Sequence, residues 1–358
     1  MTESTPVGPR PLPEPTPRES RPLVETIGLK KHFAIRKGLW GKVSGYVRAV
    51  DGISLAIHPG ETVGVVGESG CGKTTLGRLI LRLLDASAGQ VYLNGADLGA
   101  MDRPQMRAVR RQMQIIFQDP YSSLNPRMTV GRIVGEGIKI HRLATGSEVV
   151  DRVAGLLQMV GLPASAARRY PHEFSGGQRQ RIGIARALAV EPTFMVADEP
   201  VSALDVSVQA QIVNLLQDVQ QQRGLTYLFI AHDLSVVRHI SDRVAVMYLG
   251  RLVELASKQA LYEDPSHPYT RALLAAVPVP DPALRKRQAV LQGDVPNPAD
   301  VPPGCPFHPR CPERQEICSR VVPPLTELED GRRVACLLRD PSGLVSERGS
   351  SEPADEVA

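Results

Sequence analysis

Short apolar runs recur along the chain, and each one stops at a glycine or at a charged pair. Residues 62–66 read TVGVV, residues 194–197 read FMVA, and residues 227–231 read YLFIA. A strand covered on both faces of a sheet is apolar at every position, so these runs predict buried strands. Parallel strands end at one edge of their sheet, where ligands bind. The pattern therefore predicts an α/β fold with a parallel sheet.

Apolar residues with helical spacing lie between the runs, and the middle stripe indicates a helical subdomain over about 118–182. From about Thr26 to Leu98 we expect mixed strands, including an antiparallel part. The three stripes consist of Leu76, Leu79, Ile80, Leu83 and Leu84; of Val149, Val153, Leu156, Leu157 and Val160; and of Val208, Ile212, Leu215, Leu216 and Val219.

The segment after the first run reads GESGCGKT, which is a complete GxxxxGK[ST] phosphate loop between a strand and a helix. Its glycines let the backbone wrap phosphate oxygens, Lys73 is expected to reach the terminal phosphates, and the Thr74 hydroxyl is expected to hold Mg²⁺. A glycine-rich turn that binds nothing is the alternative, and the complete motif in this context argues against it. The predicted ATP-binding residues are Gly67, Glu68, Ser69, Gly70, Cys71, Gly72, Lys73, Thr74 and Thr75.

Polar residues also follow the other two runs. Asp198 and Glu199 come after the second, and two carboxylates there suit two tasks: Asp198 can join the Mg²⁺ shell, while Glu199 can orient or deprotonate an attacking water. His232 follows the third run, and alone it would be an ordinary histidine. Its convergence with the phosphate loop and the acid pair at one sheet edge favours a functional site.

The segment FSGGQRQR, at 174–181, places a serine and two glycines where a helix begins, and a helix start is an anion site. If it served the same site as Lys73, it would have to reach the C-terminal edge of the sheet while leading directly into the strand near Phe194. That path is sterically awkward, so a second subunit is the better candidate for its anion. The expected anion-binding residues are Ser175, Gly176, Gly177 and Gln178.

Together these motifs resemble the ATP-binding subunit of an ABC transporter over most of the chain, although Phe174 stands where many members have Leu. The resemblance implies a P-loop ATPase domain at 24–260 with a RecA-like parallel-sheet core, an antiparallel β subdomain and a helical subdomain. It implies that Gln118 senses Mg²⁺ and faces the membrane subunits, that Asp205 crosses the dimer interface, and that His232 contacts the γ-phosphate. It also implies two ATP molecules held between two chains.

The sequence offers two candidates for the aromatic residue that contacts adenine. The resemblance implies an aromatic residue near Phe33, but an insertion from Ile35 to Tyr46 makes Tyr46 a rival. Plain core packing is the alternative for either ring.

The C-terminal part bears four of the five cysteines, Cys305, Cys311, Cys318 and Cys336. Disulfides are unfavourable in a reducing cytoplasm, and the spacing is not that of a zinc ribbon. The segments at 267–278 and 304–311 resemble the extension of the peptide/nickel branch of ABC importers, which implies a [4Fe-4S] cluster on these cysteines. Four free thiols remain the alternative. We expect this extension at 261–340.

The segment FQDPYSSLNPRMTV, at 117–130, resembles the F-type subunit of oligopeptide or dipeptide importers. The resemblance implies a homologous D-type ATPase as the dimer partner, with a homodimer as the alternative. It also implies two membrane permease subunits and an extracytoplasmic substrate-binding protein. Peptide, nickel, glutathione and oligosaccharide all remain possible cargoes.

Composition agrees with a peripheral subunit at the cytoplasmic face of the membrane. Of 358 residues 42% are hydrophobic, yet no apolar stretch approaches the roughly 18 residues that a membrane span needs. A net charge of +4 does not argue for nucleic-acid binding. Residues 1–23, rich in proline, and 341–358 are expected to be disordered. Three other classes are less favoured. A soluble ABC ATPase of translation or repair usually has two sets of ATPase motifs, whereas this chain has one, and a regulator without turnover would be expected to lose Glu199, which is present. Exporter ATPases are commonly fused to membrane spans, and no such span is seen in this sequence.

Overall fold

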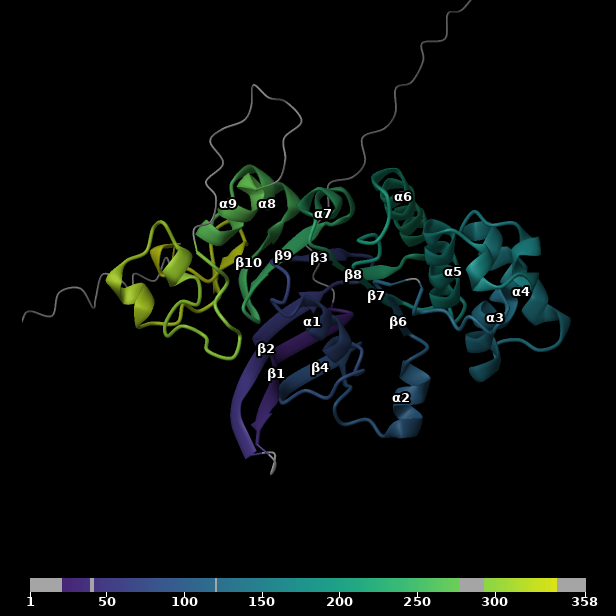
Figure 1. Ribbon diagram of the computed structural model, residues 1–358, viewed down its shortest axis with the longest axis horizontal. Helices are drawn as coiled ribbons and strands as arrows, with labels where there is room; N and C mark the ends of the chain where they lie inside the picture. Colours follow the sequence, from purple (N-terminus) through teal and green to yellow (C-terminus); the bar gives the residue numbers. More distant parts are fainter. Residues whose placement is uncertain (1–20, 39–41, 120, 277–292, 340–358) are drawn as a thin grey trace, which may run out of the picture.

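The computed structural model describes residues 21–38, 42–119, 121–276 and 293–339 (Figure 1). Its main sheet has eight strands in the order β11-β12-β10-β9-β3-β8-β7-β6. The strands are β3 (Thr62–Val66), β6 (Met113–Ile116), β7 (Phe194–Asp198), β8 (Thr226–Ile230), β9 (Arg243–Tyr248), β10 (Arg251–Ser257), β11 (Thr326–Glu327) and β12 (Arg333–Val334).

The parallel part of this sheet confirms the prediction from the apolar runs. Strands β6, β7, β8, β3 and β9 pair in parallel, whereas β10, β12 and β11 continue the sheet in antiparallel pairs. Every residue of β3, β7 and β8 is buried, as expected for strands covered on both faces. The phosphate loop, the acid pair and His232 therefore leave the sheet at the same edge.

A second sheet is antiparallel, as predicted for the N-terminal part, and has the order β2-β1-β4-β5. Its strands are β1 (Val24–Lys37), β2 (Lys42–Ile57), β4 (Ala88–Leu93) and β5 (Ala96–Asp97). Leu76, Leu79 and Ile80 of the helix after the phosphate loop are buried in one core cluster with residues of both sheets. Figure 1 shows this helix, α1, between the two sheets.

The helices follow the sequence pattern with one correction. They are α1 (Lys73–Ile80), α2 (Arg103–Val109), α3 (Val130–Ile140), α4 (Ser147–Met159), α5 (Gly176–Leu188), α6 (Val206–Arg223), α7 (Leu234–Ile240), α8 (Lys258–Glu263) and α9 (Pro268–Ala275). Helix α1 ends before Leu83 because the backbone of Arg82 has a φ of 50°, which is not helical. The Leu83 side chain is 46% exposed. The prediction that the helix continues through Leu83 and Leu84 is therefore wrong, since α1 ends at Ile80. The stripes in α4 and α6 pack as core.

The helices α3, α4 and α5 gather beyond edge strand β6, and the C-terminal residues lie at the opposite end of the molecule (Figure 1). The short 3₁₀ helices are η1 (Ala164–Arg168), η2 (Pro171–Glu173), η4 (His308–Arg310), η5 (Glu316–Ser319) and η6 (Leu337–Arg339). Because β11 and β12 extend the main sheet, the C-terminal residues are joined to the core. Within the part of the chain that is described, no helix is long and apolar enough to cross a membrane.

Some predictions fall on residues that the structure does not describe. The expected disorder of 1–23 and 341–358 lies almost wholly outside the described residues, as do Val277 and Pro278 of the segment at 267–278.

Candidate nucleotide-binding site

The phosphate loop connects β3 to α1 and depends on glycine at its tightest points. Gly72 has a φ of 105°, which places it in the left-handed region. A Cβ on Gly72 would lie 1.9 Å from the carbonyl oxygen of Ala49, and one on Gly67 would lie 2.2 Å from the carbonyl oxygen of Met247. Since both obstacles are backbone atoms, a side chain at either position would displace the loop.

Lys73 lies buried across this loop. Its ammonium Nζ donates hydrogen bonds to the carbonyl oxygens of Gly67, at 2.8 Å, and Glu68, at 3.1 Å. These carbonyls satisfy the ammonium, which can exchange them for phosphate oxygens without leaving the loop.

Thr74 and Asp198 meet at the start of α1. The Thr74 hydroxyl Oγ1 donates a hydrogen bond to Asp198 Oδ1 at 2.7 Å. Burial raises the pKa of Asp198, and the hydrogen bond from Thr74 opposes that rise. A buried carboxylate beside a hydroxyl offers the oxygen ligands that Mg²⁺ prefers, and a cation would offset the cost of burying the charge. These two residues therefore fit a magnesium ion.

Glu199 follows β7 with a φ of 45°, an uncommon conformation for a residue with a side chain. Its backbone N–H donates to the carbonyl oxygen of Ile230 at 2.9 Å, which holds this turn in place. Gln118 Nε2 donates to Glu199 Oε2 at 3.0 Å, and His232 Nδ1 lies 3.3 Å from the same oxygen. The sheet edge therefore presents a carboxylate whose position is fixed by two neighbouring side chains.

One cavity of about 300 Å³ joins nine of the predicted residues with Ala49. It is lined by Ala49, Ser69, Gly70, Gly72, Lys73, Thr74, Thr75, Gln118, Glu199 and His232. Residues from 49 to 232 thus converge on one space beside a phosphate loop. Cationic, hydroxyl, amide and carboxylate groups there can hold a phosphate chain, a metal ion and a water.

The residues Ser175, Gly176, Gly177, Gln178 and Asp205 do not line this cavity. Ser175 Oγ accepts from the Gln178 N–H at 3.4 Å, and the Gln178 side chain accepts from the Ser175 N–H at 3.1 Å. This reciprocal cap starts α5 at an exposed position. Asp205 directly precedes α6 and is also exposed. Within one chain, Ser175, Gln178 and Asp205 are exposed to solvent, and Gly176 and Gly177 are partly exposed.

The two aromatic candidates for an adenine contact lie on the antiparallel sheet. Phe33 is 39% exposed and Tyr46 is 52% exposed, so the core-packing interpretation is wrong for both. The Lys31 ammonium lies 5.2 Å from the centre of the Phe33 ring. Neither ring lines the cavity, although Ala49 of the same sheet does. Adenine stacking by Phe33 stays a prediction.

All five cysteines are free, and Cys71 is buried in the phosphate loop. The Cys305 N–H donates to the carbonyl oxygen of Cys318 at 2.8 Å, which joins two cysteine-bearing turns. Burial raises the pKa of Cys305 to about 11, and the other three thiols add to the rise. Among the described residues, no group of three or more His, Cys, Asp or Glu could hold a metal ion.

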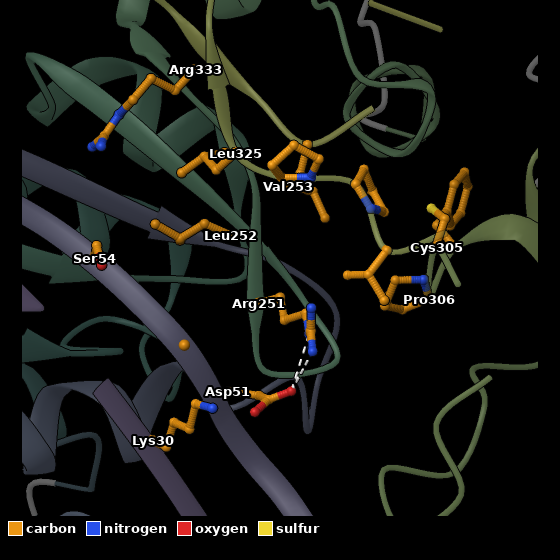
Figure 2. Close-up of a pocket in the computed structure, with 16 residues that line it drawn as sticks. Lys30, Asp51, Ser54, Arg251, Leu252, Val253, Cys305, Pro306, Leu325 and Arg333 are labelled. Carbon is orange, nitrogen blue, oxygen red and sulfur yellow. Dashed lines mark hydrogen bonds and ion pairs between the residues drawn. The ribbon is translucent and has the colours of Figure 1, made fainter. Parts of the chain in front are cut away.

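A second cavity, of about 470 Å³, is lined by residues of the ATPase core and of the C-terminal part (Figure 2). Figure 2 shows Arg251 of β10 directed at Asp51 of β2, and their atoms Nη2 and Oδ2 are 2.7 Å apart. Cys305 and Pro306 form part of the opposite wall. Burial would raise the pKa of Asp51, but two hydrogen bonds from Arg251 to Oδ2, together with the contact of His32 with Oδ1, hold the pKa below its usual range.

Sequence reasoning missed two residues that contact the phosphate loop. Arg310 Nη1 and Nη2 donate to Glu68 Oε2 and Oε1 at 2.8 and 3.0 Å. The hydroxyl of Tyr269 accepts from the Glu68 N–H at 3.0 Å. No local signal could identify Arg310, which is 242 positions from its partner.

A phosphate loop after a central parallel strand, with an acid pair and a histidine at the neighbouring strand ends, defines an ATP-binding cassette. Family models agree: "ABC transporter" matches residues 50–202, and "Oligopeptide/dipeptide transporter, C-terminal region" matches residues 253–318. The chain is 51% identical over 319 residues to the oligopeptide transport ATP-binding protein AppF of Bacillus subtilis, covering 88% of this chain and 97% of that protein. A Brucella ovis protein with the provisional name peptide import ATP-binding protein is 54% identical, covering 88% and 98%.

Solved structures of ABC transporter ATPases also resemble this chain. A dimeric ATP-binding cassette in a post-hydrolysis state with ADP and Pi has a TM-score of 0.59 at 29% identity, covering 66% of this chain and 98% of that one. The cbiO1 protein of Clostridium perfringens, part of an ABC transporter complex, has a TM-score of 0.59 at 26% identity, covering 68% and 92%. The chain belongs to the ATP-binding subunits of the ABC transporter family, and it is an ATPase of that family.

Proposed function

We propose that this chain hydrolyses ATP to energise the uptake of oligopeptides or dipeptides across the cytoplasmic membrane, through ATP-driven closure of a dimer. The observation that carries the proposal is the single cavity that joins the phosphate loop to Glu199, Gln118 and His232. The C-terminal region and the names of the relatives support peptides as the cargo. Nickel or another small solute is the alternative cargo.

The chain's own groups divide the work at this site. Lys73 and the N–H groups of the loop would hold the phosphates of ATP, and Thr74 with Asp198 would hold Mg²⁺. The metal supplies positive charge that stabilises the phosphates during transfer. Glu199 takes the proton of the attacking water, while Gln118 and His232 keep its carboxylate oriented.

The exposed start of α5 supports a composite site. Ser175, Gly176, Gly177 and Gln178, with Asp205 nearby, would contact the nucleotide of a second ATPase chain, which is a homologous D-type subunit or a second copy of this chain. The dimer would work with two membrane permeases and an extracytoplasmic substrate-binding protein. It would lie peripherally at the cytoplasmic face of the membrane. The domain division proposed is 24–260 for the ATPase and 261–340 for the extension.

We also propose a [4Fe-4S] cluster on Cys305, Cys311, Cys318 and Cys336. Its support is that the Cys305 N–H bonds to the carbonyl oxygen of Cys318 at 2.8 Å and that the other three thiols lie close enough to Cys305 to raise its pKa. Anaerobically purified protein should contain iron, with visible absorbance that disappears in Cys311→Ser. Protein without iron would favour four free thiols.

The test of the ATPase assignment is Glu199→Gln. The amide keeps the volume of the side chain but cannot accept a proton, so turnover should fall by roughly 10²–10⁴-fold. ATP binding should persist, and a closed dimer should accumulate with ATP, measured by size-exclusion chromatography.

The matched control is Glu148→Gln, at an exposed glutamate of α4 paired with Arg152, which should hydrolyse ATP at the normal rate. Normal turnover in Glu199→Gln would remove Glu199 from the base role. Failure of the unmodified chain to bind ATP would overturn the function itself.

A further inference from the structure

Glu68 is the second residue of the phosphate loop, and it is held from three directions. Its carboxylate accepts two hydrogen bonds from Arg310, at 2.8 and 3.0 Å. Its N–H donates to the Tyr269 hydroxyl at 3.0 Å, and its carbonyl oxygen accepts from Lys73 at 3.1 Å. Two of these three contacts come from residues beyond the last parallel strand of the core.

Both outer partners are themselves fixed. The Arg310 side chain is only 6% exposed and closes η4, in the segment that carries Cys305 and Cys311. Tyr269 is fully buried in α9 and packs between Tyr248 and Phe307, with ring centres 4.7 and 5.3 Å away. Aromatic packing of this kind leaves a side chain little freedom. Arg310 and Tyr269 are therefore rigid supports.

We propose that Arg310 and Tyr269 are positioning residues for the phosphate loop, through which the C-terminal extension holds the loop in the shape that accepts a triphosphate. The proposal deepens the ATPase function above and rests on it. Arg310 and Tyr269 both act on Glu68, and neither of them lines the nucleotide cavity.

The contacts of Arg310 and Tyr269 with Glu68 should strengthen ATP binding in two ways. A loop rich in glycine has many conformations, and ordering it beforehand reduces the entropy lost when the phosphates bind. Glu68 also places a negative charge in a loop that must bind an anion. The guanidinium of Arg310 neutralises that charge through two hydrogen bonds, and its loss would leave an unpaired carboxylate in the phosphate loop.

The first experiment measures the binding of a fluorescent ATP analogue with Mg²⁺ to the full chain. Arg310→Ala should raise the Kd about tenfold, which is typical for the loss of charge-assisted hydrogen bonds. The same substitution in a Glu68→Ala background should change the Kd less than about twofold, because the partner is already absent. Arg320→Ala is the matched control: this arginine of the extension is exposed and pairs with Glu316, so the Kd should not change.

If Arg310→Ala instead destabilised the whole extension, the two measurements would change differently. It would lower the Tm and raise the Kd equally in both backgrounds, and that outcome would overturn the proposal. So would an unchanged Kd in Arg310→Ala when the unmodified chain binds ATP. If the unmodified chain binds no ATP, it is the ATPase function that fails instead.

Tyr269→Phe provides a second, milder test if Arg310→Ala does not fold. It removes only the hydroxyl that accepts from Glu68, so the Kd should rise about two- to fivefold with kcat at saturating ATP nearly unchanged. An unaltered Kd would exclude Tyr269 from the positioning role.

Discussion

Replacing Gly72 by alanine should destabilise the protein and disable the phosphate loop together. The left-handed backbone at this position costs a residue with a Cβ roughly 1–2 kcal/mol. The new Cβ would stand 1.9 Å from the carbonyl oxygen of Ala49, and relieving such an overlap adds roughly 1–3 kcal/mol. The strand of Ala49 has little room to retreat, because Asp51 N–H donates to Gly250 O and Gly250 N–H donates to Cys71 O. The sum is about 2–5 kcal/mol.

Urea unfolding of Gly72→Ala and of the unmodified chain measures this loss. The displaced loop should also weaken ATP binding roughly 100-fold, since a shift of about 1 Å is enough to misalign the contacts. Gly155→Ala is the control, because its Cβ would meet nothing within 4 Å on an exposed face of α4, and it should stabilise the chain by roughly 0.5–1 kcal/mol. Equal stability and equal ATP affinity in Gly72→Ala would refute the steric reasoning.

Three further changes test other parts of the structure. Burial lowers the pKa of His267 from 6.5 to about 3, so the unfolded chain binds this proton first as the pH falls. The stabilising effect of the neutral ring is complete above pH 6.5 and should shrink by about 2 kcal/mol between pH 7 and pH 5. Unfolding of His267→Asn should show a pH slope smaller by that amount, and an equal slope would contradict the assignment. Phe307→Ala empties a fully buried site and should cost roughly 3–5 kcal/mol in urea unfolding; a loss under about 1 kcal/mol would show that the aromatic cluster does not anchor the extension. Ser175→Arg should abolish hydrolysis while ATP binding by the monomer stays within about twofold, and weakened monomer binding would contradict a site shared between two chains.

The parts of the site that could be predicted are those in which a motif follows a buried strand. Lys73, Asp198 and His232 each come directly after an apolar run or its loop, and parallel pairing brings these strand ends together. The end of α1 could not be predicted, because its apolar spacing continues to Leu83 while the backbone turns at Arg82. Periodicity shows where apolar residues recur, and backbone geometry decides where the helix stops.

The arrangement of the four C-terminal cysteines could not be predicted from the sequence. Their number and a family resemblance led to an expected iron–sulfur cluster, but ligand geometry is a property of folded turns rather than of spacing. Within the residues described, no group suited to a metal ion is formed, and Cys305 is buried with a raised pKa.

By itself, the sequence determined that this chain carries an ATPase site of the ABC type, because its motifs are local and parallel strands place local motifs at one edge. Only the tertiary structure decided what supports that site. Glu68 and Arg310 are 242 positions apart, and their pairing depends on the extension folding back onto the main sheet, where β12 pairs with β10. Such a contact is made by packing and leaves no pattern in the sequence around either residue.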